Sequence, residues 1–324
     1  MMFFDSLLPA AISIATVFLF GCIGEIITEK AGHLNLGIPG VMCFGTLGGC
    51  VGVSLFMNAY SSNPENAPYF LLLLSGLVFS ALFSAIAGLI YGVLTVSLRC
   101  NQNVTGLVLT TFGGGIADYF MSSVDKTYFS QASKILSSYP LWADNLGAFG
   151  KIFFAHGFLV YFAIVIAILT AVILKKTRIG LNLRSVGENP AAADADGVNV
   201  NAYKYSAILT GSIIAAFSGL FYVMDYVGGS WENSSTIQAF GWLAIALVIF
   251  VVWKPSLAIL GSILFGFLYI LPYKISGITF VTMQAFKMIP YIVTVIVLVL
   301  TSIIGKKSVQ PPESLGLPYF REDR

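Results

Sequence analysis

Charged residues are scarce in this sequence. Only 10% of its 324 residues are Asp, Glu, Lys or Arg, whereas soluble domains carry about a quarter. Hydrophobic residues make up 57% of the chain, which indicates that its solvent is the lipid bilayer. Because every backbone polar group must be satisfied within lipid, the composition predicts an all-α polytopic membrane protein. The net charge of only +2 gives no reason to expect a nucleic-acid partner.

Motifs for catalysis and metal binding are also missing. The only Gly-Lys pair, Gly305-Lys306, has Leu300 where a P-loop requires its upstream glycine. The two histidines, His33 and His156, stand apart from any Ser-His-Asp or Cys/His grouping. The four cysteines lack zinc or redox spacing and are expected to be reduced packing residues. We therefore expect no catalytic residue, metal or bound cofactor in this chain.

Long apolar runs are what the sequence does contain. A helix that crosses the hydrocarbon core needs about 20 apolar residues, and about nine such crossings (8–10) are predicted. The half-apolar segment 276–288, which holds Gln284 and Lys287, predicts a half-helix or re-entrant piece before Pro290. The nine predicted crossings lie near residues 7–28, 36–57, 69–98, 103–124, 153–174, 203–227, 237–253, 256–272 and 286–304.

The basic residues predict the orientation, because loops rich in Lys and Arg stay on the cytoplasmic side. The loop 175–204 alone holds five of the seventeen basic side chains, whereas the loops 58–68 and 228–236 hold none. An N-out, C-in topology places the basic loop inside. It also places four lysines outside, against the rule: Lys126, Lys134, Lys151 and Lys274. We expect a transmembrane domain over 1–305, with an external loop at 125–152 and the cytoplasmic loop at 175–204, and a cytoplasmic tail over 306–324.

The basic loop predicts a short helix for contact with a soluble partner. Asn189-Pro190 can start a helix, because proline is tolerated in the first turn. Three strong helix formers, Ala191, Ala192 and Ala193, follow, and Gly197 can end the helix. Such a helix would present small side chains at the membrane surface.

Two glycine-rich stretches predict special backbone conformations. The junction 24–40 is interrupted by glycines and a proline, which fits either a discontinuous helix beside a cavity or an ordinary hairpin. The run Gly113-Gly114-Gly115 after Phe112 predicts a bend, an unwound turn or a close approach to substrate. The pairs Gly45/Gly49, Gly48/Gly52 and Gly88/Gly92 predict tight helix packing.

Two acidic residues fall within the predicted spans. Asp118 and Asp225 are each followed by a tyrosine, Tyr119 and Tyr226, and Tyr222 is nearby. Acids in a membrane span are rare and often functional, so these residues could line a polar passage where rings stack on a substrate. The alternative is an interfacial aromatic belt with carboxylates that reach water.

Residues 29–40 resemble the signature that follows the first span in permease subunits of nucleoside and simple-sugar ABC importers, which work with lipoproteins of the basic membrane protein family. Residues 178–197 look like that family's main cytoplasmic loop, and residues 241–255 and 311–321 agree. The resemblance covers nearly the whole chain. One departure is Pro39, where the family usually has an acidic residue, so any role of that carboxylate is either absent here or taken over by Glu25 or Glu29.

This resemblance implies an ABC importer permease fold with a cytoplasmic coupling helix, in a bacterial cell membrane. Its implied partners are a second permease chain in a heterodimer, a cytoplasmic ATPase that uses ATP and Mg, and an external substrate-binding lipoprotein. A permease for branched-chain amino acids is an alternative, and an ion-coupled secondary transporter is a more distant one. The ATPase-coupling candidates are Arg184, Gly187, Glu188, Asn189, Pro190, Ala191, Ala192, Ala193, Asp194 and Gly197. The translocation-pathway candidates are Asn35, Gly37, Phe112, Gly114, Asp118, Tyr119, Tyr222, Asp225 and Tyr226.

Overall fold

The structure, a computed structural model, describes residues 2–275, 277, 279–304 and 310–320. Its regular structure over these residues is helical, and the basic residues Lys306 and Lys307 of the predicted tail lie outside them. The elements in chain order are α1 (Met2–Lys30), α2 (Ile38–Ala59), η1 (Pro64–Asn66), α3 (Tyr69–Gly92), η2 (Val93–Ser97), α4 (Gln102–Met121), α5 (Phe129–Leu136), η3 (Leu141–Leu146), α6 (Gly147–Phe153), α7 (Phe158–Lys176), α8 (Arg178–Glu188), α9 (Pro190–Ala195), α10 (Val200–Phe221), η4 (Tyr222–Tyr226), α11 (Ser234–Phe250), α12 (Pro255–Lys274) and α13 (Phe280–Ile304).

Within the described residues, 7 helices are long and apolar enough to cross a membrane, which makes the chain a multi-pass membrane protein. They are α1, α2, α3 with η2, α7, α10 with η4, α12 and α13. The other two predicted crossings correspond to α4, which is less apolar, and to α11, which has 17 residues.

The half-helix predicted over 276–288 is wrong for the part that the structure describes. Helix α13 runs without a break from Phe280 to Ile304 and contains Pro290. A proline removes one backbone hydrogen bond, but membrane helices tolerate it where nearby groups satisfy the freed carbonyl. The carbonyl that Pro290 leaves without an N–H partner is that of Phe286, whereas the Thr294 hydroxyl donates to the carbonyl of Pro290 itself (2.9 Å).

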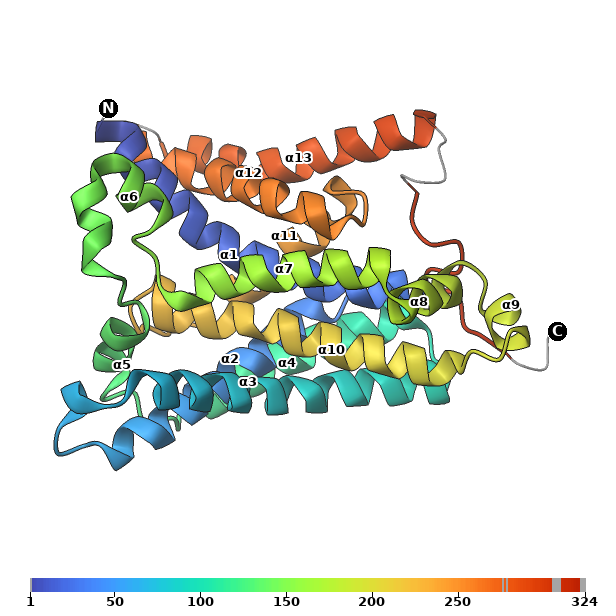
Figure 1. The fold of residues 1–324 in the computed structure, drawn as a ribbon, viewed down its shortest axis with the longest axis horizontal. Coiled ribbons are helices and arrows are strands. Elements are labelled where there is room, and N and C mark those ends of the chain that lie inside the picture. The colour runs from blue at the N-terminus through green and yellow to red at the C-terminus, as the bar shows by residue number, and fades with distance from the viewer. Residues whose placement is uncertain (1, 276, 278, 305–309, 321–324) are drawn as a thin grey trace.

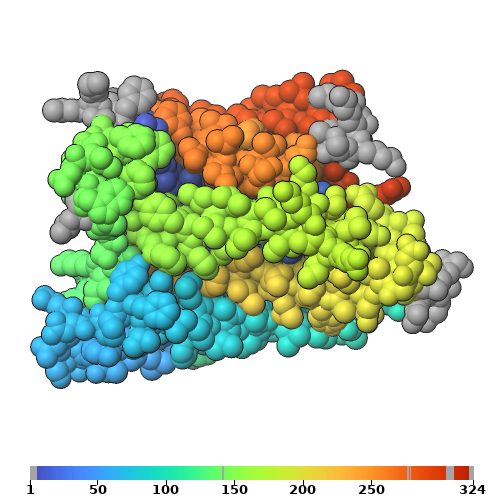
Figure 2. All heavy atoms as spheres, viewed as in Figure 1, coloured from blue at the N-terminus to red at the C-terminus, as the bar shows by residue number. Residues whose placement is uncertain are grey.

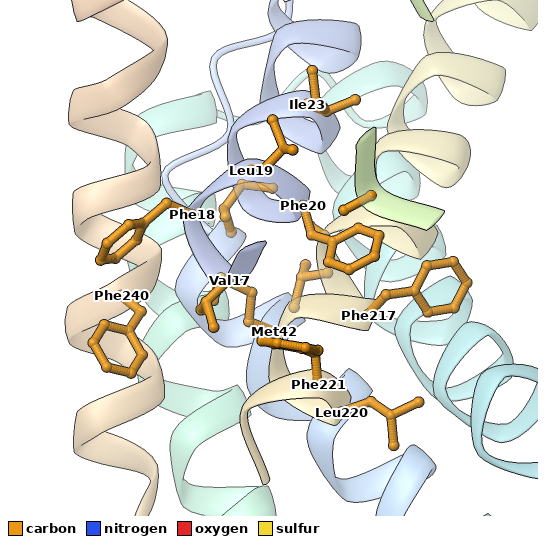
Figure 3. Packing of buried hydrophobic residues seen from close by; sticks show 14 of the residues in the cluster. Val17, Phe18, Leu19, Phe20, Ile23, Met42, Phe217, Leu220, Phe221 and Phe240 are labelled. Carbon is orange, nitrogen blue, oxygen red and sulfur yellow. The ribbon is translucent and has the colours of Figure 1, made fainter. Parts of the chain in front are cut away.

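Helix α1 lies at the centre of the bundle, packed against α7, α10, α11 and α12. Its buried side chains reach in different directions, as Figure 3 shows. The ring of Phe18 meets Phe240 of α11 edge-on at 5.7 Å, and that of Phe20 meets Phe217 of α10 at 6.0 Å. Edge-to-face aromatic pairs add to the stability gained from burial. A helix apolar on all sides is therefore placed where neighbours surround it.

Glycines bring helix α2 close to two neighbours at once. A Cβ atom on Gly45 would lie 2.4 Å from the Ala216 Cβ on α10, and one on Gly48 would lie 2.4 Å from the Phe79 carbonyl oxygen on α3. Gly49 and Gly52 repeat these two approaches one turn later. The predicted tight packing is confirmed, since small residues let helix backbones approach closely in membranes.

Helix α4 is continuous through its three glycines, so the predicted unwound turn is wrong. A Cβ on Gly113 would lie 2.5 Å from the Gly40 carbonyl oxygen, and one on Gly114 would lie 2.0 Å from the Gln238 amide nitrogen. A Cβ on Gly115 would meet nothing within 4 Å. Gly113 and Gly114 therefore leave room for α2 and α11, and a close approach to substrate stays a prediction.

The bundle has two distinct ends (Figure 1). The short helices α5 and α6 lie at one end, near the N-terminus, and the short helices α8 and α9 lie at the other, near the C-terminus. Figure 2 shows α7 stretched across the middle of the viewed face, where it leaves little of α1 visible. We refer below to the α5–α6 end and the α8–α9 end.

Candidate functional site

Helix α8 folds back against the bundle through two glycines. The Thr177 hydroxyl accepts a hydrogen bond from the Gly180 N–H (3.1 Å) and so caps the start of the helix. A Cβ on Gly180 would lie 2.1 Å from the Ile173 carbonyl oxygen, and one on Gly187 would lie 2.2 Å from the Lys30 carbonyl oxygen. The buried face therefore rests directly on α7 and α1, whereas Ile179 and other side chains of the opposite face are exposed.

Helix α9 confirms the short helix predicted in the basic loop. The Asn189 side chain accepts from the Ala192 N–H (3.0 Å), and Pro190 occupies the first turn. Gly197 follows the helix with φ +86°, a backbone conformation that favours glycine. The six-residue helix is thus specified by its own local sequence.

The structure divides the ATPase-coupling candidates into a buried group and an exposed group. Ala193 is fully buried between Val186 and Val200, so it does not belong to a docking surface. Gly187 is buried against α1, and Asp194 accepts a hydrogen bond from the Tyr319 hydroxyl (2.8 Å). Pro190 and Ala191 are partly exposed. The exposed candidates are Arg184, Glu188, Asn189, Ala192 and Gly197.

The tail over residues 310–320 crosses this end and connects α8 to the α1–α2 turn. The Ser314 N–H and hydroxyl both donate to the Gly187 carbonyl, at 3.0 and 2.6 Å. Two residues later, the Gly316 N–H donates to the Gly32 carbonyl (3.2 Å). The Arg99 guanidinium lies 4.6 Å from the centre of the Phe320 ring. The sequence indicates this tail only through the family resemblance of residues 311–321 and carries no local signal for these contacts.

The α1–α2 turn is held by buried polar groups. The Asn35 N–H donates to the Glu25 carboxylate (3.0 Å), and the Asn35 side-chain oxygen accepts from the Gly37 N–H (2.9 Å). The Tyr91 hydroxyl donates to the Leu34 carbonyl (2.7 Å). Asn35 and Gly37 are both buried, so these two pathway candidates lie within packed structure at the α8–α9 end.

A second buried acid connects α1 to the turn between α11 and α12. Glu29, which is 2% exposed, accepts a hydrogen bond from the Trp253 indole N–H. Val252 and Trp253 both adopt positive φ, at 55° and 53°. Such conformations are costly for residues with bulky side chains and persist only when surrounding contacts hold them. The Trp253-Lys254-Pro255 motif is therefore a strained turn anchored to α1.

His33 is buried beside Lys204 at the same end. Burial is the main cause, and the nearby Lys204 charge the second, of the lowering of the His33 pKa to about 3. The imidazole is therefore neutral at physiological pH.

The remaining pathway candidates do not form one cluster. Asp118 accepts two hydrogen bonds from Ser234, one from its N–H and one from its hydroxyl, both 2.7 Å long. It thereby connects α4 to the first turn of α11, whose N-cap residue is Asn233. Of its neighbours on α4, Phe112 contacts Phe44 at 6.1 Å, and Tyr119 is 72% exposed and meets Phe120 edge-on at 5.0 Å.

Asp225 lies within the π-helical turn η4, and such turns often occur at functional sites. Its Oδ2 atom is buried and has no hydrogen-bond partner among the described residues. This oxygen is next to Gly157 at the start of α7, where a Cβ would come within 2.2 Å of it. The rings of Tyr222 and Tyr226, on either side of Asp225, stack at 5.7 Å. Asp225 therefore points toward α7, and its assignment to a passage stays a prediction.

Comparison with protein families gives one extended match. The family described as branched-chain amino acid transport system / permease component matches residues 8–298, which is most of the chain.

Curated relatives match over similar lengths. The nucleoside ABC transporter permease protein NupC of Lactococcus lactis subsp. cremoris is 33% identical over 95% of this chain and 94% of its own length. The guanosine ABC transporter permease protein NupQ of Bacillus subtilis is 29% identical over 98% and 97%. A putative glucose ABC transporter permease protein, TsgC13 of Haloferax volcanii, is 32% identical over 83% and 77%. No solved structure gives a significant match.

Proposed function

Because the chain belongs to the permease-component family of branched-chain amino acid transport systems, we propose that it forms the translocation pathway for nucleosides in an ATP-driven ABC importer. The observation that carries this proposal is the α8–α9 pair. These two short helices lie at one end of the bundle, with small and polar side chains exposed and their buried faces fixed to α1, α7 and the tail.

This pair has the properties that a coupling element needs. Ala192, Asp196 and Gly197 are exposed around α9, so a groove on an ATPase could receive the helix without a steric obstacle. Gly187 touches the Lys30 carbonyl at the end of α1, and α1 is central to the bundle. A displacement of α8 by an ATPase would therefore be passed directly to the core helix, because tightly packed elements move together.

The proposed assembly places the α8–α9 end in the cytoplasm. The basic residues Lys30, Arg99, Lys254 and those of the 175–204 loop lie at this end, which supports the N-out, C-in orientation. Residues 1–305 then form the transmembrane domain and 306–324 the cytoplasmic tail. The partners are a second permease chain, a cytoplasmic ATPase and an external binding lipoprotein, in a bacterial cell membrane.

The substrate class follows from the relatives. NupC and NupQ are named for nucleosides and guanosine, and both align with nearly the whole chain. Simple sugars are the second candidate, because TsgC13 is named for glucose. None of the three is named for branched-chain amino acids, and that alternative is not supported by them.

Reconstitution tests the proposal. The chain should be coexpressed with the permease and ATPase genes of its own operon, purified through a tag on this chain, and placed in liposomes with the cognate binding protein. We expect the ATPase to copurify with this chain. Labelled guanosine or uridine should be transported only when ATP is supplied on the side of the liposome membrane that carries the ATPase. Glucose uptake in place of nucleoside uptake would establish the second candidate, and uptake without any ATPase would refute the importer.

A further inference from the structure

We propose that a hollow between α11, α12 and α13 receives the base of a nucleoside by aromatic stacking, and that Lys287 and Thr236 position it there. This inference rests on the proposed function and names the place on this chain that recognises its substrate class. None of the hollow's residues is among the pathway candidates predicted from the sequence.

The hollow lies toward the α5–α6 end, within the first turns of α11 and α13. Its volume is about 280 Å³, which is large enough for a single flat ring system. Ala239, a small residue on α11, leaves room between the helices, and Leu243 closes the inner side. The hollow's other lining residues are Ser235, Thr236, Phe240, Tyr269, Lys287 and Tyr291.

A continuous series of aromatic rings passes one wall of this hollow. Tyr226 stacks on Tyr222 at 5.7 Å, Tyr222 meets Phe240 at 5.0 Å, and Phe240 meets Tyr269 at 5.4 Å. Tyr269 then approaches Tyr273 at 5.9 Å. These spacings are the ones at which aromatic rings attract each other. A heteroaromatic base in the hollow would extend the series, and stacking accepts any base because each has a π face.

Two polar groups of the hollow, on Lys287 and Thr236, have no hydrogen-bond or ion-pair partner among the described residues. The Lys287 ammonium lies 5.4 Å from the centre of the Tyr273 ring, and no carboxylate among the described residues pairs with it. A cation within a membrane span is costly and is retained mainly where it has a function. The Thr236 hydroxyl likewise has no hydrogen-bond partner in the described part of the chain, and it lines both this hollow and a smaller one beside Tyr222 and Trp231.

These groups match the chemistry of a nucleoside. The ammonium can donate to carbonyl oxygens and ring nitrogens of a base, and the hydroxyl can bond to a ribose hydroxyl. The aromatic wall supplies contact area without a fixed hydrogen-bond pattern, which suits a site that must release its substrate. A simple sugar lacks the flat aromatic ring that the series would extend.

The reconstituted importer tests the site through matched variants. Tyr269→Leu removes a ring while keeping apolar volume, and Lys287→Gln removes the charge. Each should lower nucleoside uptake at saturating binding protein about tenfold, the size expected for one stacking or charge-assisted contact. Phe70→Leu, on an exposed aromatic of α3, should leave uptake unchanged. Copurification of the ATPase with every variant shows that the assembly is intact.

The outcomes separate this inference from the proposed function. If the wild type imports nucleosides and both hollow variants match it, the inference is refuted and the proposed function stands. If the wild type imports only glucose, the proposed substrate class fails and the inference with it.

Photolabelling gives a readout that does not depend on transport. Irradiation of the assembled importer with 8-azidoadenosine should label peptides from 262–273 or 280–291, and excess adenosine should suppress the label. Labelling that anionic lipid vesicles suppress and adenosine does not would identify a lipid headgroup site and refute the inference. Labelling confined to α4 would refute it as well.

Discussion

Ser314 donates both its backbone N–H and its hydroxyl to the carbonyl oxygen of Gly187, at 3.0 and 2.6 Å. Gly187 is the residue at which α8 touches the end of α1. The tail thus closes over the contact through which the coupling helices meet the core. Because Ser314 is buried, both hydrogen bonds are protected from competing water.

The tail should therefore stabilise α9. Tyr319→Phe removes only the hydroxyl that bonds to Asp194, which should cost about 1 kcal/mol of local stability. Hydrogen exchange of the backbone amides of residues 191–198 should become faster, with exchange in α2 unchanged. Tyr139→Phe, at an exposed position near the α5–α6 end, serves as the control. Equal protection of α9 in both variants would show that the tail does not hold it.

The neighbouring alanines of α9 should respond differently to the same change. Ala192 is exposed, so Ala192→Arg should leave the fold intact but abolish binding-protein-stimulated ATP hydrolysis and uptake. Ala193 is fully buried, so Ala193→Arg should disrupt α9 and lower thermal stability by several kcal/mol, about the cost of burying an unpaired charge. The measurements are uptake and thermal unfolding in detergent. Normal uptake with Ala192→Arg would remove α9 from the ATPase interface.

Substitutions of the two membrane acids, Asp118 and Asp225, should differ in their effects on stability. Asp118→Ala removes the two hydrogen bonds that Ser234 donates to α4 and should lower stability by about 1 kcal/mol, together with any effect on transport. Asp225→Asn leaves the shape of η4 intact and relieves a buried, unpartnered carboxyl oxygen, so stability should be kept. If Asp225 serves the passage, uptake should nevertheless fall. Wild-type uptake with Asp225→Asn would assign Asp225 a structural role.

Stability should depend on pH through His33. Its pKa is about 3 in the folded chain, whereas a free histidine has a pKa of about 6.5. Between these values the unfolded chain binds a proton that the folded chain does not, so stability falls as the pH drops below about 6.5. The loss at pH 5 should be about 2 kcal/mol. The His33→Asn variant should lack this pH-dependent loss of stability. Thermal unfolding of wild type and variant between pH 7 and 5 measures the difference in their pH dependence. An identical slope in wild type and variant would contradict the burial of a neutral imidazole.

Cysteine labelling tests the orientation. In a background without the native cysteines, Asp196→Cys should react with an impermeant maleimide only from the cytoplasm, and Ser62→Cys only from outside. Both positions are exposed and lie on opposite ends of the proposed topology. Reaction of residue 196 from outside would invert the topology and exclude α9 as an ATPase contact.

Several features could be predicted because they depend on local chemistry. The start of α9 follows from Asn189 and Pro190, since a cap and a first-turn proline act within four residues. The glycine pairs of α2 predicted close packing, because spacing along one helix fixes which residues share a face. The prediction failed where Gln284, Lys287 and Pro290 suggested a break, because the continuity of α13 does not depend on local polarity alone.

The sequence alone determined that the chain is helical and spans a membrane, because bilayer thickness and backbone hydrogen bonding leave no other solution for such a composition. It also determined the existence of a short amphipathic loop helix. Only the tertiary structure decided that Ala193 is buried while Ala192 is exposed, that Asp118 accepts hydrogen bonds from Ser234, 116 residues away, and that Ser314 closes over Gly187. These features depend on which distant segments meet. Hydrophobic packing determines those meetings, and because it is non-directional, the sequence does not show which segments pair.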